Sequence, residues 1–207
     1  MTAAAPLPAP RPAPLLPSPA PARVALLCLL LTVAVALSLL AMGRLPVAAS
    51  GGVRLWSGLG DPGGTSQHIA DWYTPSHVIH GILFYALWRL AVRWSGRPIP
   101  LGWALVAAFA LEGLWEVVEN TPFVINRYRD STIAVGYTGD TVVNAVSDVL
   151  AMALGFLLAW RLPAALVAGL AAAMELLTLW LIRDNLTLNV IMLLWPLEGI
   201  KAWQAMA

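Results

Sequence analysis

One stretch of the sequence, residues 24–43, contains no charged side chain. An α-helix rises 1.5 Å per residue, so about 20 apolar residues cross the ~30 Å hydrocarbon core of a membrane. Four more apolar stretches of similar length follow, at residues 75–92, 101–118, 141–160 and 164–182. The sequence therefore predicts an all-α, polytopic membrane helix bundle of about five transmembrane helices.

The composition supports a surface that faces lipid. Charged residues make up only 11% of the 207 residues, against roughly 25% in soluble domains, and the mean hydropathy is +0.76. The net charge of +1 gives no basic surface for nucleic acid, so membrane lipid is the expected partner. Cys28 is the only cysteine, which excludes an intrachain disulfide and predicts a small buried hydrophobe. A protein partner or a homo-oligomer is left open.

Segments outside these stretches complete the domain organisation. Residues 1–22 alternate proline with alanine, which favours extended polyproline geometry and predicts a disordered tail before a single transmembrane domain at 23–207. A cleaved signal peptide is the alternative for the first stretch, although its apolar segment is normally only 7–15 residues. Residues 44–74 and 119–140 are predicted to be polar loops. Residues 189–203, which are interrupted by Pro196 and Glu198, predict a C-terminal interfacial helix rather than a sixth crossing.

The orientation rests on the arginine and lysine residues of the connecting segments. Their number is equal on the two faces. However, Arg127 and Arg183 lie among acidic residues and are candidates for function, and leaving them out favours a cytoplasmic N-terminus.

Polar side chains within the predicted helices are spaced three or four residues apart, so each set shares one helical face. The sets are His77 with His80; Glu112, Glu116 and Glu119; Asp140, Asn144 and Asp148; and Glu175 with Arg183. Successive antiparallel helices bring the starts of the second and fourth helices and the ends of the third and fifth to the same face. The sequence therefore predicts one polar site at one membrane face.

Three functions are possible for this polar site. In the first, an envelope enzyme or binder acts on a lipid or its headgroup, because buried ionisable residues in membranes are costly and usually functional. Its catalytic candidates are His77, His80, Glu116, Glu119, Asp140 and Asn144, and Arg127 and Arg183 bind an anion or headgroup. Helix capping by Asp140 and interfacial snorkelling of the arginines are the simpler readings. His77 and His80 could also share one metal ion, with a third ligand from another helix such as Glu116, Glu119 or Asp140. No HExxH-type motif is present, and the metal and any cofactor stay unknown.

The second function is a proton- or cation-coupled transporter or channel subunit, with Glu112, Asp148 and Glu175 as a relay near the midplane. Few ionisable residues occupy the other halves of the predicted helices, which counts against a path across the membrane. A structural subunit of a membrane assembly is a third reading, in which the polar residues serve only helix packing.

Four motifs carry a resemblance to a known family. They are SQHIADWYTPSHVIHG, WEVVENTPFVINRYR, GDTVVNAVSDVLAMALGF and IRDNLTLNVIMLLWPLEGIKAWQ. In this order, over about residues 65–204, they resemble an uncharacterised bacterial membrane family, domain-of-unknown-function family 2585. The resemblance implies the fold and a multi-pass location in the bacterial inner membrane, but no activity.

A looser resemblance is to VanZ-like membrane proteins. Comparable places are filled by His80, Glu116, Glu119, Arg127, Asp140, Asn144 and Gly155. Glu119 stands where that pattern prefers glutamine, and the Asp-Lys pair before the histidine is missing. The resemblance implies a role in the cell envelope.

Overall fold

The protein is described by a computed structural model that covers residues 14–59, 61, 63–132, 134 and 136–206. Within these residues it has eight helices and no strand, which confirms the predicted all-α class. The helices are α1 (Pro21–Ala41), α2 (Thr74–Ser95), α3 (Leu101–Glu119), α4 (Pro122–Ser131), α5 (Val142–Arg161), α6 (Ala164–Ile182), α7 (Leu186–Leu194) and α8 (Glu198–Gln204).

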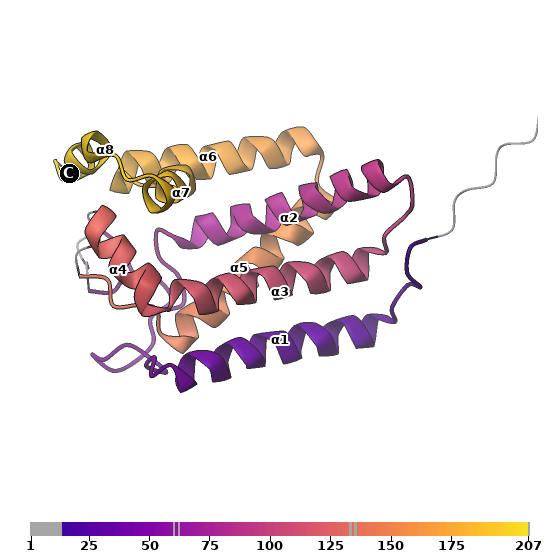
Figure 1. The fold of residues 1–207 in the computed structure, drawn as a ribbon, viewed down its shortest axis with the longest axis horizontal. Helices are drawn as coiled ribbons and strands as arrows, with labels where there is room; N and C mark the ends of the chain where they lie inside the picture. The colour runs from indigo at the N-terminus through magenta and orange to yellow at the C-terminus, as the bar shows by residue number, and fades with distance from the viewer. Residues whose placement is uncertain (1–13, 60, 62, 133, 135, 207) are drawn as a thin grey trace, which may run out of the picture.

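Five of these helices are long. Helices α1, α3, α5 and α6 are long and apolar enough to cross a membrane. Helix α2 has 22 residues, is less apolar than these four, and runs beside them in the same bundle (Figure 1). All five agree with the predicted spans to within three residues at each end. The predicted helical membrane bundle is therefore confirmed.

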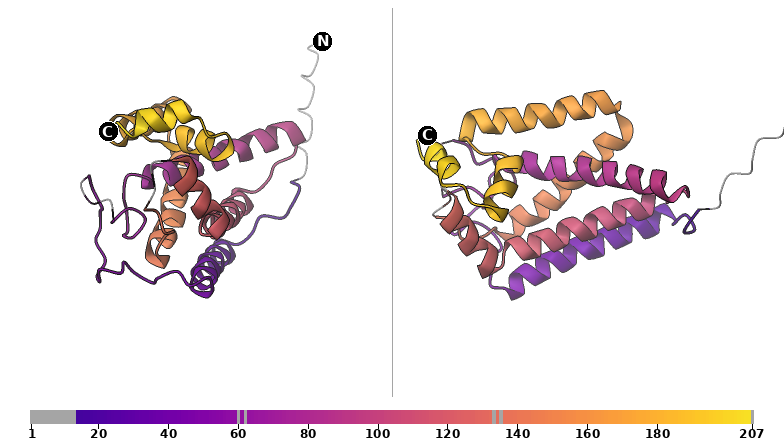
Figure 2. Two further views of the ribbon diagram at one scale, coloured as in Figure 1. Left: turned by 60° about the vertical axis from the view of Figure 1, so that its left-hand side comes forward. Right: turned by 45° about the horizontal axis from the view of Figure 1, so that its top comes forward.

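The long helices alternate in direction, as the hairpin argument requires. Helix α2 packs against α5, α3 and α6, while α1 packs against α3 and α5 (Figure 1). The starts of α2 and α5 and the ends of α3 and α6 meet at one end, where α4, α7 and α8 also gather (Figure 2). We call this half of the bundle, with residues 44–73, the polar half. The opposite half, which holds the α2–α3 and α5–α6 connections, is the apolar half.

Two glycines let α2 and α5 touch along their backbones. A Cβ atom on Gly81 would lie 1.9 Å from the carbonyl oxygen of Met152, and one on Gly155 would lie 1.9 Å from that of Val78. Small residues allow this close approach between membrane helices. His77 precedes Gly81 by one helical turn, so the contact also holds His77 close to α5.

The apolar half is packed by hydrophobic side chains only. Its largest buried set is Cys28, Ala104, Ala108, Phe109, Val149, Met152 and Phe156. Cys28 is 8% exposed, in keeping with its predicted role as a buried hydrophobe. Large leucines such as Leu87 and Leu170 are exposed on the outside of the helices, as a lipid-facing surface requires.

Two predicted connections differ from the structure. Residues 122–131, expected in a loop, form α4, which starts with Pro122 and is capped by Thr121. The C-terminal segment forms two short helices, α7 and α8, instead of one, because Pro196 interrupts it. With nine and seven residues these helices are about 14 and 10 Å long, too short for a sixth crossing.

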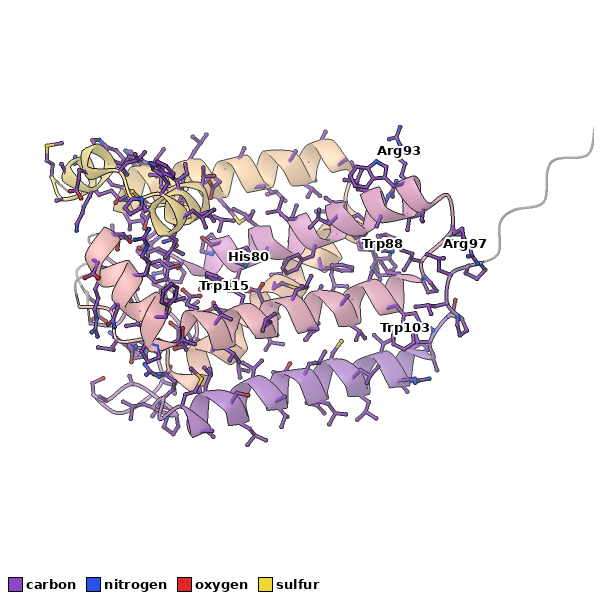
Figure 3. The ribbon with its side chains drawn as sticks, in the orientation of Figure 1. His80, Trp88, Arg93, Arg97, Trp103 and Trp115 are labelled. Atoms are coloured by element: carbon purple, nitrogen blue, oxygen red, sulfur yellow. The ribbon has the colours of Figure 1, made fainter. Side chains whose placement is uncertain are left out.

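The described part of the N-terminal segment lies against the start of α3. Trp103 Nε1 donates a hydrogen bond to the carbonyl oxygen of Pro17 at 2.9 Å, and the Leu15 amide donates to that of Pro98 at 3.0 Å. Figure 3 shows Trp103 at this end together with Trp88, Arg93 and Arg97. Residues 1–13 of the predicted tail lie outside the described residues.

Candidate functional site

Five ionisable side chains meet inside the polar half, between α2, α3 and α5. They are His77, His80, Glu112, Glu116 and Asp148, and we call them the His–acid cluster. Glu112 and Glu116 are 0% exposed, while Asp148 and His77 are also buried. Figure 3 shows His80 between α2 and α3. The three- and four-residue spacings on α2 and α3 put each pair of side chains on the face toward its neighbours.

His77 lies at the centre of the cluster. Its Nδ1 atom is 2.7 Å from Glu112 Oε1 and 3.4 Å from Glu116 Oε1, and its Nε2 atom is 3.8 Å from Asp148 Oδ2. His80 Nδ1 lies 3.1 Å from both oxygens of Glu112. The carboxylate of Glu112 is therefore held by two imidazoles.

Glu116, one turn from Glu112, has no such partners. Neither of its carboxylate oxygens forms a hydrogen bond with the described residues, and Oδ1 of Asp148 is likewise unpartnered. A buried carboxylate without a hydrogen bond is strongly unfavourable. A proton, a water molecule or a cation at the oxygens of Glu116 and at Oδ1 of Asp148 would offset this cost. The arrangement can serve either acid–base chemistry or cation binding.

Asp140, another predicted member of the site, lies in a separate network nearer the membrane face. Its Oδ2 atom accepts a hydrogen bond from Asn120 Nδ2 at 2.6 Å, and its amide donates to Asn120 Oδ1 at 2.7 Å. Tyr137 donates to Asp140 Oδ1 at 2.9 Å. Burial raises the pKa values of the Asp140 carboxyl and the Tyr137 phenol. The network ties α3 to α5, and the side chain that caps α5 is Thr141 rather than Asp140.

Asn144 anchors the segment that precedes α2. Its Nδ2 atom donates to the carbonyl oxygen of His68 at 2.9 Å. Ser57, His68 and Asp71 in this segment are all buried. Sequence reasoning missed these three residues because a non-helical segment has no periodicity from which burial can be inferred.

A second missed network covers the polar half. Tyr73 donates to Asp184 Oδ2 at 3.0 Å, Asn189 donates to the same oxygen at 3.4 Å, and Tyr128 donates to Asn189 Oδ1 at 2.6 Å. Burial raises the pKa of the Asp184 carboxyl. The chain of hydrogen bonds joins the start of α2 to α4, α6 and α7. Its members are single polar residues far apart in sequence, so no spacing signal indicates them.

The remaining predicted acids do not join the cluster. Glu175 accepts hydrogen bonds from the amides of Leu186 and Thr187 at 3.0 and 3.1 Å and so binds the N-terminus of α7. Glu119 is half-buried and forms no side-chain hydrogen bond with the described residues. Of the proposed midplane relay, only Glu112 and Asp148 come together.

The two predicted anion-binding arginines lie apart from the cluster and contact backbone. Arg127 Nε donates to the carbonyl oxygen of Leu193 at 2.9 Å, and Arg183 donates to that of Trp203 at 3.0 Å. Arg183 also lines an open groove of about 550 Å³ with Leu176, Leu179, Trp180 and Trp203. The cluster lines neither this groove nor the smaller one between α1 and α3, and its carboxylates are buried.

Comparison with known proteins identifies the family but no activity. A family model described as "Protein of unknown function (DUF2585)" matches residues 39–206. A "UPF0314 protein" of Sinorhizobium fredii is 56% identical over 164 residues, covering 79% of this chain and 81% of the relative. Those of Paracoccus denitrificans and Novosphingobium aromaticivorans are 54% and 47% identical, covering 81% and 80% of this chain and 84% of each relative.

No solved structure matches the chain. The VanZ-like resemblance is not addressed by these matches and stays a prediction. The family match covers every member of the His–acid cluster and both surrounding networks. On this match and these identities, the chain belongs to the DUF2585 family of bacterial proteins of unknown function, here an apolar helical bundle with a buried His–acid cluster.

Proposed function

We propose that this protein is a cell-envelope enzyme that carries out acid–base chemistry on the headgroup of a membrane lipid. The observation that carries the proposal is the buried Glu116 carboxylate, which accepts no hydrogen bond from the described residues and lies 3.4 Å from His77 Nδ1. A helical bundle gains no stability from such a group, because its desolvation is not offset by hydrogen bonds. A catalytic role accounts for a group that packing alone disfavours.

The depth of the cluster supports a headgroup substrate. His77 and Glu116 each lie three residues from the polar end of their helix, about 5 Å along the axis, and Glu112 lies about 10 Å in. These depths match the boundary between headgroups and acyl chains better than the centre of a 30 Å core. The apolar half has no buried acidic, basic or histidine side chain among its described core residues. This pattern disfavours the transporter reading, which needs a polar path to the opposite face.

The roles follow from the partners of each side chain. Glu116 is free to accept a proton from an attacking water or hydroxyl group. His80 is the more exposed of the two histidines, so its ring lies nearest to an entering headgroup, and Glu116 passes the proton it has accepted on to the leaving group. Glu112 orients both imidazoles. Glu119, Asp140 and Asn144 then belong to the supporting structure, and the headgroup must enter from the polar face.

Lipid turnover by the purified full-length protein tests the proposal. The protein is reconstituted in vesicles of total bacterial lipid extract, and the lipids are analysed by mass spectrometry before and after incubation. We expect a lipid to be converted by the wild type and by His68→Gln, but at least a hundredfold more slowly by Glu116→Gln, since general acid–base catalysis contributes about 10²–10⁴-fold. His68 is a buried histidine outside the cluster.

An unchanged lipid profile with the wild type would contradict the enzymatic proposal. Equal turnover by wild type and Glu116→Gln would also contradict it. A structural-subunit role predicts a different result, in which His80→Ala or Glu116→Ala impairs assembly with other membrane proteins while no lipid is converted.

We further propose that the protein spans the inner membrane with its N-terminus in the cytoplasm, so that the polar half faces the periplasm. The arginine distribution supports this orientation once Arg127 and Arg183 are left out. Single cysteines at positions 74, 121, 138 and 186, in a Cys28→Ala background, should all react with an impermeant thiol reagent added to spheroplasts. A cysteine at position 97 should stay protected. The reverse pattern would overturn the orientation, and a mixed pattern would overturn the common face.

A further inference from the structure

We propose that the His–acid cluster binds one divalent transition-metal ion, such as zinc, ferrous iron or manganese. His77, His80 and Glu112 are the ligands, and Glu116 faces the open coordination position. This inference deepens the function proposed for the same side chains and rests on it for its biological role.

The geometry of the three ligands supports the assignment. One potential ligand atom from each of His77, His80 and Glu112 lies within 4.8 Å of the other two. The shortest separations are 2.7 Å from His77 to Glu112 and 3.1 Å from His80 to Glu112. Ligands about 2.1 Å from a zinc ion lie about 3.4 Å apart in a tetrahedral shell. Small side-chain rotations therefore suffice to admit an ion.

The types of donor indicate the class of metal. Two imidazole nitrogens and a carboxylate suit zinc, iron or manganese, and three protein ligands leave a position for water or substrate. Cys28 lies in the apolar half, so the site has no thiolate ligand. The calcium class is disfavoured because calcium prefers six to eight oxygen ligands.

Glu116 supplies an independent second observation. It is fully buried, and both of its oxygens lack a hydrogen-bond donor among the described residues. Protonated histidines would donate hydrogen bonds to Glu112, but they leave the Glu116 oxygens and Oδ1 of Asp148 without a hydrogen bond, although His77 Nδ1 lies 3.4 Å from Glu116 Oε1. Water bound to a metal ion at the open position is the donor that Glu116 lacks, and it becomes more acidic on binding. Glu116 is then the group that accepts its proton.

Asp148 has a positioning role on the opposite side of His77. The Nδ1 atom of His77 faces Glu112, while its Nε2 atom lies 3.8 Å from Asp148 Oδ2. Histidines that bind metals commonly direct their second ring nitrogen at a carboxylate, which fixes the tautomer and the ring orientation. The glycine contact between α2 and α5 keeps the two residues close.

Metal analysis of the purified full-length protein tests this site directly. Wild type and variants are expressed with zinc, iron and manganese in the medium and purified in mild detergent, and bound metals are measured by mass spectrometry. We expect about one ion per chain in the wild type and in the control His68→Gln, and at least tenfold less in His77→Gln and Glu112→Gln. Glu116→Gln, one turn from Glu112 on the same helix, should keep its ion.

Thermal unfolding gives a second readout that does not depend on metal retained during purification. Chelator-stripped wild type should gain about 5–10 °C in its unfolding midpoint when the free ion reaches a hundred times its Kd, since the ion binds only the folded state. Glu112→Gln should gain nothing under the same conditions. The unfolding curve of each stripped variant also shows whether it is folded.

Three outcomes would overturn the site. The wild type could bind none of the three metals in either assay. His68→Gln could lose as much metal as His77→Gln, which would indicate adventitious binding. Glu116→Gln could lose the ion while Glu112→Gln keeps it, which would refute the ligand assignment. If the protein binds an ion but converts no lipid, the enzymatic proposal is contradicted and the metal site stands. If metal-free protein converts lipid, the metal site is contradicted and the enzymatic proposal stands.

Discussion

The two halves of the bundle are built from the same helices, but one buries apolar side chains and the other buries ionisable ones. In the apolar half, α2, α3 and α5 are held by hydrophobic side chains. In the polar half, the same three helices bury His77, Glu112, Glu116 and Asp148. The apolar half is stabilised by its packing. The polar half contains groups that packing alone does not explain.

The comparison shows how a small membrane protein can hold a costly site. Desolvated carboxylates lower the stability of the half that contains them, and close helix packing in the other half offsets this cost. The capping layer of α4, α7, α8 and residues 44–73 adds hydrogen bonds over the polar end. We therefore expect mutations in the apolar half to act on stability, and those in the cluster to act mainly on function.

The largest expected effect is on the glycine contact between α2 and α5, where the two halves join. Gly155→Ala puts a Cβ atom 1.9 Å from the Val78 carbonyl oxygen, so α2 and α5 must separate. Overpacking of this kind costs about 3 kcal/mol or more when the neighbour is backbone. Thermal unfolding in detergent should show a large loss of stability. The control Gly169→Ala, in α6, has no atom within 4 Å of the new Cβ and should leave stability unchanged or slightly higher, because alanine favours a helix more than glycine does. Equal effects of the two changes would refute the close packing.

The next largest effect is a difference in stability between substitutions of two glutamates that lie one helical turn apart. In the presence of chelator, Glu112→Gln should cost about 2 kcal/mol, because it weakens hydrogen bonds to both histidines. Glu116→Gln should cost much less, because its carboxylate accepts no hydrogen bond and loses only the 3.4 Å contact with His77. Denaturation of the two variants side by side measures the difference. A greater loss for Glu116→Gln would mean that its carboxylate is satisfied in the folded protein.

A smaller effect is the pH dependence of the network at the membrane face. Burial raises the pKa of Asp140 in the folded state, so the folded protein holds this proton more tightly than the unfolded chain. Its contribution to stability is full below the ordinary aspartate pKa of about 3.9 and is lost as the pH rises through the raised value. As the pH rises from about 3.9 through the raised pKa of Asp140, the unfolding midpoint of the wild type should therefore fall more than that of Asp140→Asn. Parallel curves would contradict the raised pKa.

The smallest effect concerns the end of the apolar half. Trp103→Phe removes the hydrogen bond to the carbonyl oxygen of Pro17 and should cost about 1 kcal/mol. It should also make the segment before Pro21 easier to cleave by an added protease. Trp94→Phe is the matched control, because Trp94 is 79% exposed. If cleavage is the same in both variants, the N-terminal segment is not held by Trp103.

Long apolar helices could be predicted from the sequence, whereas a short polar helix could not. Helix α6 runs over exactly the predicted residues 164–182, because Pro163 precedes it and Arg183 follows in a left-handed conformation. Helix α4 was missed because its sequence is polar, and its packing against α7 through Tyr128 involves a residue 61 positions away. Hydropathy identifies helices that face lipid, but not short helices that cover a bundle.

The candidate site shows the same limit. Spacings of three and four residues were enough to group His77 with His80 and Glu112 with Glu116. They could not show that Glu175 binds the N-terminus of α7 instead of joining the cluster. Nor could they show that the third histidine, His68, is buried in a non-helical segment. Each of these depends on a contact between segments that no local pattern encodes.

The amino-acid sequence alone is enough to predict the long helices, their alternating directions and the common end at which the polar residues gather. Apolar length and helical period are local properties, and antiparallel connectivity follows from them. Which carboxylates accept hydrogen bonds is visible only in the folded bundle. Hydrogen bonds depend on distances of a few ångströms between helices, and these distances are set by side-chain packing across the bundle rather than by spacing along the chain.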